Sequence, residues 1–156
     1  MLEIDIPGRE TLRLKHIVLD YNGTIACDGA LIAGVNERLA ALADMLQVHV
    51  LTADTFGKAQ EGLEGIACRL SVLSRDAQDI GKLNYVKGLG AEHVICVGNG
   101  RNDRLMLKAA ALGIAIIFKE GAAADTIAAA DIVCTDIVSA LELLQHPLRL
   151  IATLRT

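Results

Sequence analysis

The chain has 156 residues, of which 53% are hydrophobic and 22% charged, and its formal net charge is −4. This length is typical of one domain with one hydrophobic core, so we expect residues 1–156 to form a single domain. The Lys and Arg residues are scattered, which argues against nucleic acid as a partner. The most apolar stretch, residues 105–118, is shorter than the roughly 20 residues that span a membrane.

The N-terminus and the cysteines indicate the cellular setting. The first ten residues lack the charged-then-apolar plan of a secretory signal. The four cysteines form no C-x-x-C pair, so we expect neither a zinc site nor a thioredoxin-type motif. We therefore expect a cytoplasmic protein that does not bind a membrane.

Strand and helix patterns alternate along the chain. Apolar residues around Pro7-Gly8 predict an N-terminal hairpin at 2–15, and Asp28-Gly29 predicts a second hairpin. Five apolar runs predict strands, at 16–20, 48–54, 93–99, 113–118 and 131–136. Helices are predicted at 35–46, 56–66, 79–89, 102–111 and 136–145, and Pro147 begins a final turn or short helix.

This alternation predicts the fold class. Continuous apolar runs are typical of strands that are covered on both faces, as in parallel sheets. We expect an α/β fold, with a doubly wound, mainly parallel sheet between two helical layers and right-handed crossovers. Ligands of such sheets bind at the carboxyl ends of the strands, so the residues after each strand are the candidate site.

Polar side chains follow three of the predicted strands. "DYNGT" (20–24) begins with Asp20 at the end of one strand, Thr52 ends the next, Lys82 opens a helix, and "GNGRND" (98–103) follows a later strand. An aspartate can attack phosphorus and form an aspartyl phosphate. A hydroxyl, backbone N–H groups and a lysine can hold the phosphoryl oxygens and neutralise their charge. Carboxylate and carbonyl oxygens suit magnesium. The set favours magnesium-dependent phosphoryl transfer.

The motifs "DYNGT", "LTADT", Lys82 and "GNGRND" resemble, in order, the four motifs of the haloacid dehalogenase-like (HAD) phosphohydrolase superfamily. The variants look most like its soluble P-type ATPase-like members, and the resemblance runs from residue 16 to residue 145. It implies a Rossmann-like core, Mg²⁺ as cofactor and a phosphorylated substrate. The short segments between the motifs leave no room for a cap domain, so we expect an open site or one covered by a second subunit in a homo-oligomer.

The resemblance implies roles for individual residues. Asp20 would be the nucleophile, Thr52 would bind the phosphoryl group, and Lys82 would be the lysine of the third motif, with Lys87 as the alternative. Mg²⁺ would be held by Asp20, by the backbone carbonyl of Asn22, and by Asn99 or Asp103. Phosphate binding would be supported by Asn22, Gly23, Thr24, Ala53 and Asn102.

Three residues depart from the family pattern. Phosphatases of the family usually have an aspartate at the position of Asn22, where it protonates the leaving group; such acid-base help is typically worth about 10²–10⁴ in rate. Asn99 replaces the first aspartate of the fourth motif, which should weaken Mg²⁺ binding. Ala53 replaces the glycine of the pump's second motif, which bears on nucleotide binding.

The leading hypothesis is a magnesium-dependent phosphohydrolase, phosphatase or ATPase-like, that is slow or selective and acts through an aspartyl phosphate at Asp20. The alternative is a regulatory or binding module of low activity that holds phosphate, nucleotide or metal. A third is an unrelated doubly wound domain, such as a receiver-like phosphoacceptor or a dinucleotide binder. "VGNGRND" fits a dinucleotide fingerprint poorly, because it lacks the third glycine.

Overall fold

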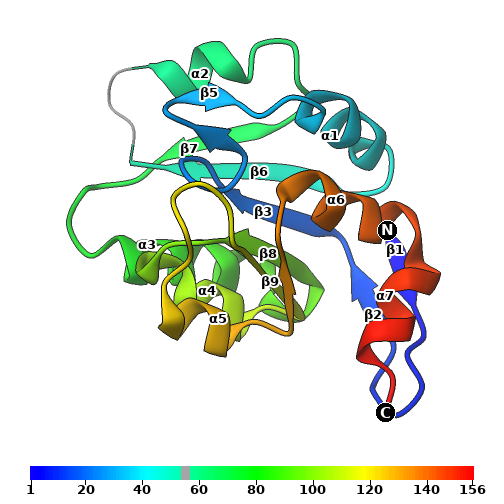
Figure 1. Cartoon of the computed structure of the whole chain (residues 1–156). Coiled ribbons are helices and arrows are strands. Elements are labelled where there is room, and N and C mark those ends of the chain that lie inside the picture. The colour runs from blue at the N-terminus through cyan, green and yellow to red at the C-terminus, as the bar shows by residue number, and fades with distance from the viewer. Residues whose placement is uncertain (54–56) are drawn as a thin grey trace.

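The computed structural model describes residues 1–53 and 57–156 (Figure 1). Its centre is a six-stranded parallel sheet in the order β10-β9-β8-β3-β6-β7. In chain order its strands are β3 (His16–Asp20), β6 (Gln47–Thr52), β7 (Arg69–Val72), β8 (Val94–Gly98), β9 (Leu112–Ile116) and β10 (Ile132–Cys134). The predicted α/β fold with a mainly parallel sheet is confirmed.

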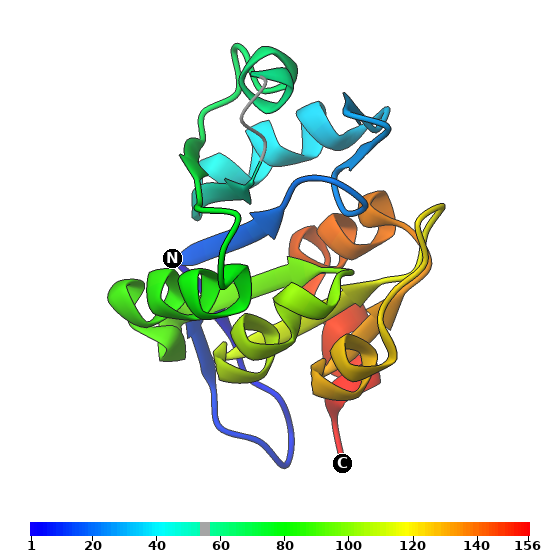
Figure 2. The same cartoon turned by 90° about the vertical axis from the view of Figure 1, so that its left-hand side faces the viewer.

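Helices cover both faces of this sheet (Figures 1 and 2). Helices α1 and α6 pack against each other on one face, and α3, α4 and α5 pack in succession on the other. The helices are α1 (Val35–Ala43), α2 (Lys58–Gly62), α3 (Gln78–Leu89), α4 (Arg104–Ala109), α5 (Ala124–Ala129), α6 (Ile137–Gln145) and α7 (Pro147–Leu154), with 3₁₀ turns η1 (Ala91–His93) and η2 (Arg101–Asp103).

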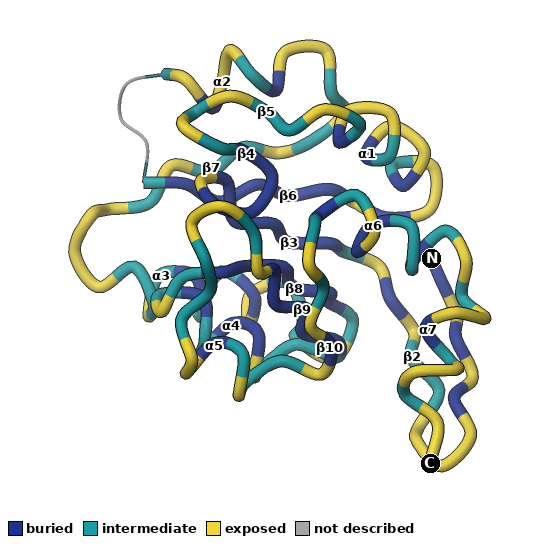
Figure 3. Tube along the Cα trace, viewed as in Figure 1, coloured by how far each residue is buried: buried dark blue, intermediate teal, exposed yellow. Residues whose placement is uncertain are grey.

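The central strands are buried on both faces (Figure 3). In β3, Ile17 and Leu19 belong to the core beneath α1 and α6, whereas Val18 belongs to the second core beneath α3 and α4. Side chains alternate between the two faces of a strand, so a strand between two helical layers needs apolar residues at every position. This is the physical cause of the unbroken apolar runs in the sequence.

Both predicted hairpins are present. β1 (Leu2–Ile4) pairs with β2 (Leu12–Leu14), and this hairpin lies beside α7 (Figure 1). β4 (Ala26–Cys27) pairs with β5 (Ala30–Leu31) around Asp28-Gly29. Asp28 and Gly29 have φ values of 52° and 82°, the left-handed conformation that a two-residue hairpin turn requires.

Several elements differ from the sequence prediction. Neither β7 nor α5 was predicted, because β7 is a half-exposed edge strand without an apolar run and α5 is short and rich in alanine. The predicted helix at 102–111 begins as the 3₁₀ turn η2, and the predicted helix at 35–46 ends at Ala43. The predicted strand 48–54 and the predicted helix 56–66 include positions among residues 54–56, which lie outside the described residues. Among the described residues, the helix predicted at 56–66 is limited to α2.

Among the described residues, the segment between β3 and β6 contains only the β4–β5 hairpin and α1, and no part forms a cap domain. No single described helix is long and apolar enough to span a membrane. Helices α6 and α7 together reach that length and composition, but they are bent by 102° at their junction.

Candidate active site

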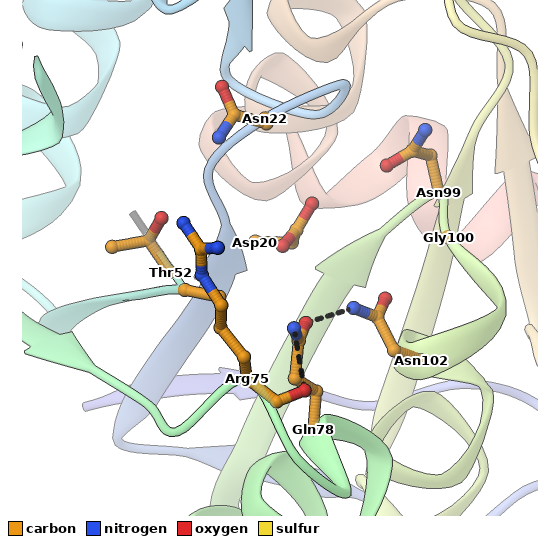
Figure 4. Close-up of a pocket in the computed structure, with 9 residues that line it drawn as sticks. Asp20, Asn22, Thr52, Arg75, Gln78, Asn99, Gly100 and Asn102 are labelled. Carbon is orange, nitrogen blue, oxygen red and sulfur yellow. Dashed lines mark hydrogen bonds between the residues drawn. The ribbon is translucent and has the colours of Figure 1, made fainter. Parts of the chain in front are cut away.

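The carboxyl ends of β3, β6 and β8 meet at one edge of the sheet, where a pocket of about 540 Å³ opens (Figure 4). Three crossovers bring these chain segments together although they are far apart in sequence. The pocket is lined by Asp20, Asn22, Thr52, Ala53, Arg75, Gln78, Asn99, Gly100 and Asn102. Six of these residues were predicted from sequence as site residues: Asp20, Asn22, Thr52, Ala53, Asn99 and Asn102.

A buried group of three charges lies under the pocket. The Lys82 Nζ atom is 2.7 Å from Asp20 Oδ1 and 2.6 Å from Asp103 Oδ1. Only 2% of the Lys82 side chain is exposed, whereas Lys87 lies on the exposed side of the same helix. The geometry therefore selects Lys82, and not Lys87, as the lysine that contacts Asp20. We call Asp20, Lys82 and Asp103 the charged triad.

The charged triad carries two carboxylates against one ammonium group, and this imbalance shifts the pKa values. Burial, together with the charge of Asp103, raises the pKa of Asp20 from 3.8 to about 7. Burial lowers the pKa of Lys82, but the attraction of the two carboxylates outweighs it, so this pKa lies above its usual value. Lys82 thus stays charged, and the charged triad beneath the pocket has a net charge of −1 when Asp20 is ionised.

Asp103 organises the loop after β8. Its Oδ2 atom accepts hydrogen bonds from the backbone N–H groups of Asn99 and Gly100, at 3.0 and 2.9 Å. Its side chain is fully buried, and a Cβ atom at position 98 would lie 2.5 Å from its Cγ, so Gly98 leaves the space that the carboxylate fills. Both oxygens of Asp103 are therefore engaged within the protein, beneath the pocket.

Thr24 links the ends of β3 and β8. Its Oγ1 atom is 3.1 Å from Asp20 Oδ2 and 3.2 Å from Asn99 Oδ1. A hydroxyl has one hydrogen, so Thr24 donates to one of these oxygens at a time. Gly23, the preceding residue, has φ 81°, and a Cβ atom there would lie 2.5 Å from Asn99 Nδ2. Only glycine satisfies both the backbone conformation and this close approach.

Solved structures of other proteins have a similar fold. A 3-deoxy-D-manno-octulosonate 8-phosphate phosphatase from Moraxella catarrhalis, crystallised with magnesium, phosphate and KDO, superposes with TM-score 0.70 at 16% identity, over 91% of this chain and 94% of that chain. A Legionella pneumophila protein described as a HAD superfamily (subfamily III A) hydrolase superposes with TM-score 0.73 at 13% sequence identity, over 92% of this chain and 88% of that chain. The chain has the HAD fold. The cobalt-bound deoxy-D-mannose-octulosonate 8-phosphate phosphatase of Haemophilus influenzae superposes with TM-score 0.71 at 15% sequence identity, over 86% of this chain and 88% of that chain.

Sequence comparison adds two relatives. An uncharacterized protein of Methanocaldococcus jannaschii is 46% identical over 83 residues, which are 51% of this chain and 89% of that protein. The chain belongs to the same family as this protein. A second uncharacterized protein of that organism is 51% identical over 39 residues, which are 25% of this chain and 89% of that protein. No protein-family model matches the chain.

Two pocket residues, Arg75 and Gln78, were missed in the sequence. They follow β7, the edge strand that lacks an apolar run. Gly100 lies within "GNGRND", although no role was assigned to it. Asn102 donates from Nδ2 to Gln78 Oε1 at 2.7 Å (Figure 4), so it braces the start of α3. The sequence signal that could have indicated Arg75 is the polar run "SRDAQD" (74–79), which leads into α3.

Proposed function

We propose that the protein is a divalent-cation-dependent phosphohydrolase that acts through an aspartyl phosphate at Asp20. The observation that supports this most is Asp20 itself, which faces the pocket while Lys82 and Thr24 hold its two carboxylate oxygens. These contacts fix the orientation of the nucleophile. The solved phosphatases and hydrolases that share the HAD fold support the same class of reaction.

The reaction consists of two displacements at phosphorus. A carboxylate oxygen of Asp20 forms a bond to phosphorus while the bond from phosphorus to the leaving group breaks. Water then attacks phosphorus, the bond to Asp20 breaks, and phosphate departs with the carboxylate restored. The Thr52 hydroxyl, at the end of β6, would bind the phosphoryl oxygens, and Arg75 would add positive charge at the pocket wall.

The donors at the pocket fit magnesium. Asp20 offers a carboxylate oxygen, Asn99 an amide oxygen and Asn22 a backbone carbonyl. The described residues contain no group of three or more His, Cys, Asp or Glu that could hold a metal, so water and the substrate's phosphate would supply further ligands, as magnesium prefers. When bound, the cation would neutralise the developing charge on the phosphoryl oxygens. Asp103, whose oxygens are engaged, would position Asn99 rather than bind the cation directly.

Asn22 limits the reaction. It lines the pocket next to the nucleophile, and an amide does not transfer a proton at neutral pH. The leaving group must therefore depart as a stable anion or take its proton from water. This favours acyl phosphates and nucleotide phosphates over simple phosphate esters.

Asn22 also motivates a second candidate function, a binding module that retains phosphate or nucleotide with little turnover. The two candidates differ in whether phosphate leaves the protein. In either case the substrate would be a phosphorylated small molecule, a nucleotide or a larger partner. The single domain, the cytoplasmic location and a homo-oligomer that covers the pocket stay predictions from the sequence.

One assay separates the candidates. The full chain is incubated with p-nitrophenyl phosphate, acetyl phosphate and ATP, with and without Mg²⁺, beside Asp20→Asn and the matched control Asp28→Asn. We expect Mg²⁺-dependent phosphate release by the wild type and Asp28→Asn but not by Asp20→Asn. If the wild type releases no more phosphate than Asp20→Asn from any of the three, the enzyme hypothesis fails. Phosphate that stays attached to Asp20 would favour the binding module.

A further inference from the structure

An acidic residue that no motif contains lies beside the candidate cation site. Glu120 belongs to the loop between β9 and α5, at residues 117–123. A Cβ atom placed on Gly23 would collide with the Glu120 carboxylate and with the Asn99 side-chain amide. The carboxylate of Glu120 and the amide of Asn99 therefore converge on one point, directly after the carbonyl of Asn22.

The loop that bears Glu120 is fixed to the end of β8. The Asn99 side chain donates from Nδ2 to the Gly121 carbonyl at 3.1 Å, and the Asn99 carbonyl accepts from the Ala123 N–H at 2.9 Å. The Thr126 hydroxyl donates to the Gly100 carbonyl at 2.6 Å. Three hydrogen bonds thus hold the 117–123 loop and the start of α5 against the 98–103 loop.

These contacts give a reason for the amide at position 99. An ionised carboxylate accepts hydrogen bonds but cannot donate one, so an aspartate there would repel the Gly121 carbonyl. Compared with an aspartate, Asn99 provides one negative charge less at the site. Its hydrogen bond to Gly121 holds the loop that places Glu120 there. Glu120 itself is exposed, and across residues 1–53 and 57–156 its carboxylate has no hydrogen-bond or ion-pair partner.

We propose that Glu120 is a cation-binding residue, which supplies from the β9–α5 loop the negative charge that Asn99 lacks. The carboxylate binds the cation directly or through one of its waters, on the side of Asn99 and Gly23. With Asp20 and Glu120 the site then offers two carboxylates to a divalent cation. This inference rests on the cation site of the proposed function, and it names a third chain segment as part of that site.

Calorimetric titration of the full chain with MgCl₂ and MnCl₂, without substrate, tests this role. We expect Glu120→Gln to weaken cation binding by about tenfold, the scale measured when groups supporting a metal site are removed. Glu120→Asp, which keeps the charge, should recover part of the affinity. Glu10→Gln is the matched control, because Glu10 is exposed in the β1–β2 hairpin, which includes no pocket residue. Without cation, Glu120→Gln should melt at the wild-type temperature.

The outcomes separate the two proposals. If Asp20→Asn lowers the affinity and Glu120→Gln binds like the wild type, Glu120 has no role at the cation and only this inference is overturned. If the wild type binds neither cation, the cation site of the proposed function fails, and the inference fails with it. A loss in Glu120→Gln equal to that in Glu10→Gln would indicate a general surface-charge effect and would also overturn the inference.

Discussion

Replacement of Asp20, the proposed nucleophile, should make the protein more stable. The charged triad buries two carboxylates around one ammonium group, so its net charge is −1. Asp20→Asn removes one negative charge and leaves Lys82 and Asp103 as a neutral pair at 2.6 Å. The new amide can still accept from Lys82 through its oxygen and donate to the Thr24 hydroxyl. We therefore expect Asp20→Asn to abolish phosphate release and to raise stability at pH 8 in EDTA.

The magnitude follows from the pKa of Asp20, which rises from 3.8 to about 7 on folding. The folded protein holds this proton more tightly than the unfolded chain, so stability falls as pH increases from 3.8 to 7. A shift of about three units corresponds to about 4 kcal/mol, which is an upper bound. The amide forms a weaker hydrogen bond with Lys82 than the carboxylate does, so we expect Asp20→Asn to raise the free energy of unfolding by about 1–3 kcal/mol. For a chain of this length this increases Tm by roughly 2–12 °C.

Calorimetric melting of both proteins at pH 8 and pH 5 measures the effect. At pH 5 the wild-type Asp20 is protonated in the folded state but largely ionised in the unfolded chain, so the difference from Asp20→Asn should shrink to less than half of its value at pH 8. Mg²⁺ added at pH 8 should stabilise the wild type more than the variant, because only the wild type gains a neutralised carboxylate. A variant that is less stable at pH 8, or equally more stable at both pH values, would refute the charge argument.

Three further outcomes are expected. Burial, with a smaller repulsion from His16 and Arg69, lowers the pKa of the buried His49 to about 4. Only the unfolded chain gains this proton between pH 6.5 and pH 4, so His49 alone should lower stability by up to about 3 kcal/mol over this range, against the gain that Asp20 contributes there. His49→Gln should remove most of this loss in urea unfolding. Asn22→Asp should increase turnover of p-nitrophenyl phosphate by about tenfold or more, since it supplies a general acid. Gly23→Ala should cost more stability than Gly65→Ala, because both have φ near 80° but only position 23 lacks space for a Cβ atom.

Each of these outcomes can fail clearly. An unchanged acid dependence in His49→Gln would show that other groups cause it. A folded Asn22→Asp variant with unchanged or lower turnover would contradict the role assigned to the missing acid. Equal losses in Gly23→Ala and Gly65→Ala would mean that backbone strain alone matters at position 23.

Much of the fold could be predicted because burial acts on each element separately. The strands of the sheet centre lie between two helical layers, and this alone requires the apolar runs that identified them. Asp20, Thr52 and Asn99 then stood out as polar residues at or after the ends of such runs. β7 gave no such signal, because an edge strand buries only part of its surface. With β7 unrecognised, Arg75 and Gln78 could not be placed at the pocket.

The sequence by itself determined the fold class and the order of most elements. It also predicted the edge of the sheet where the candidate site lies and the type of chemistry that "DYNGT" and "GNGRND" support. Only the tertiary structure chose between Lys82 and Lys87, because both lie in α3 and packing decides which side faces Asp20. It also brought Glu120 beside Asn99. That contact depends on a hydrogen bond between residues 22 positions apart, and no local pattern encodes a contact made by two loops from neighbouring strands.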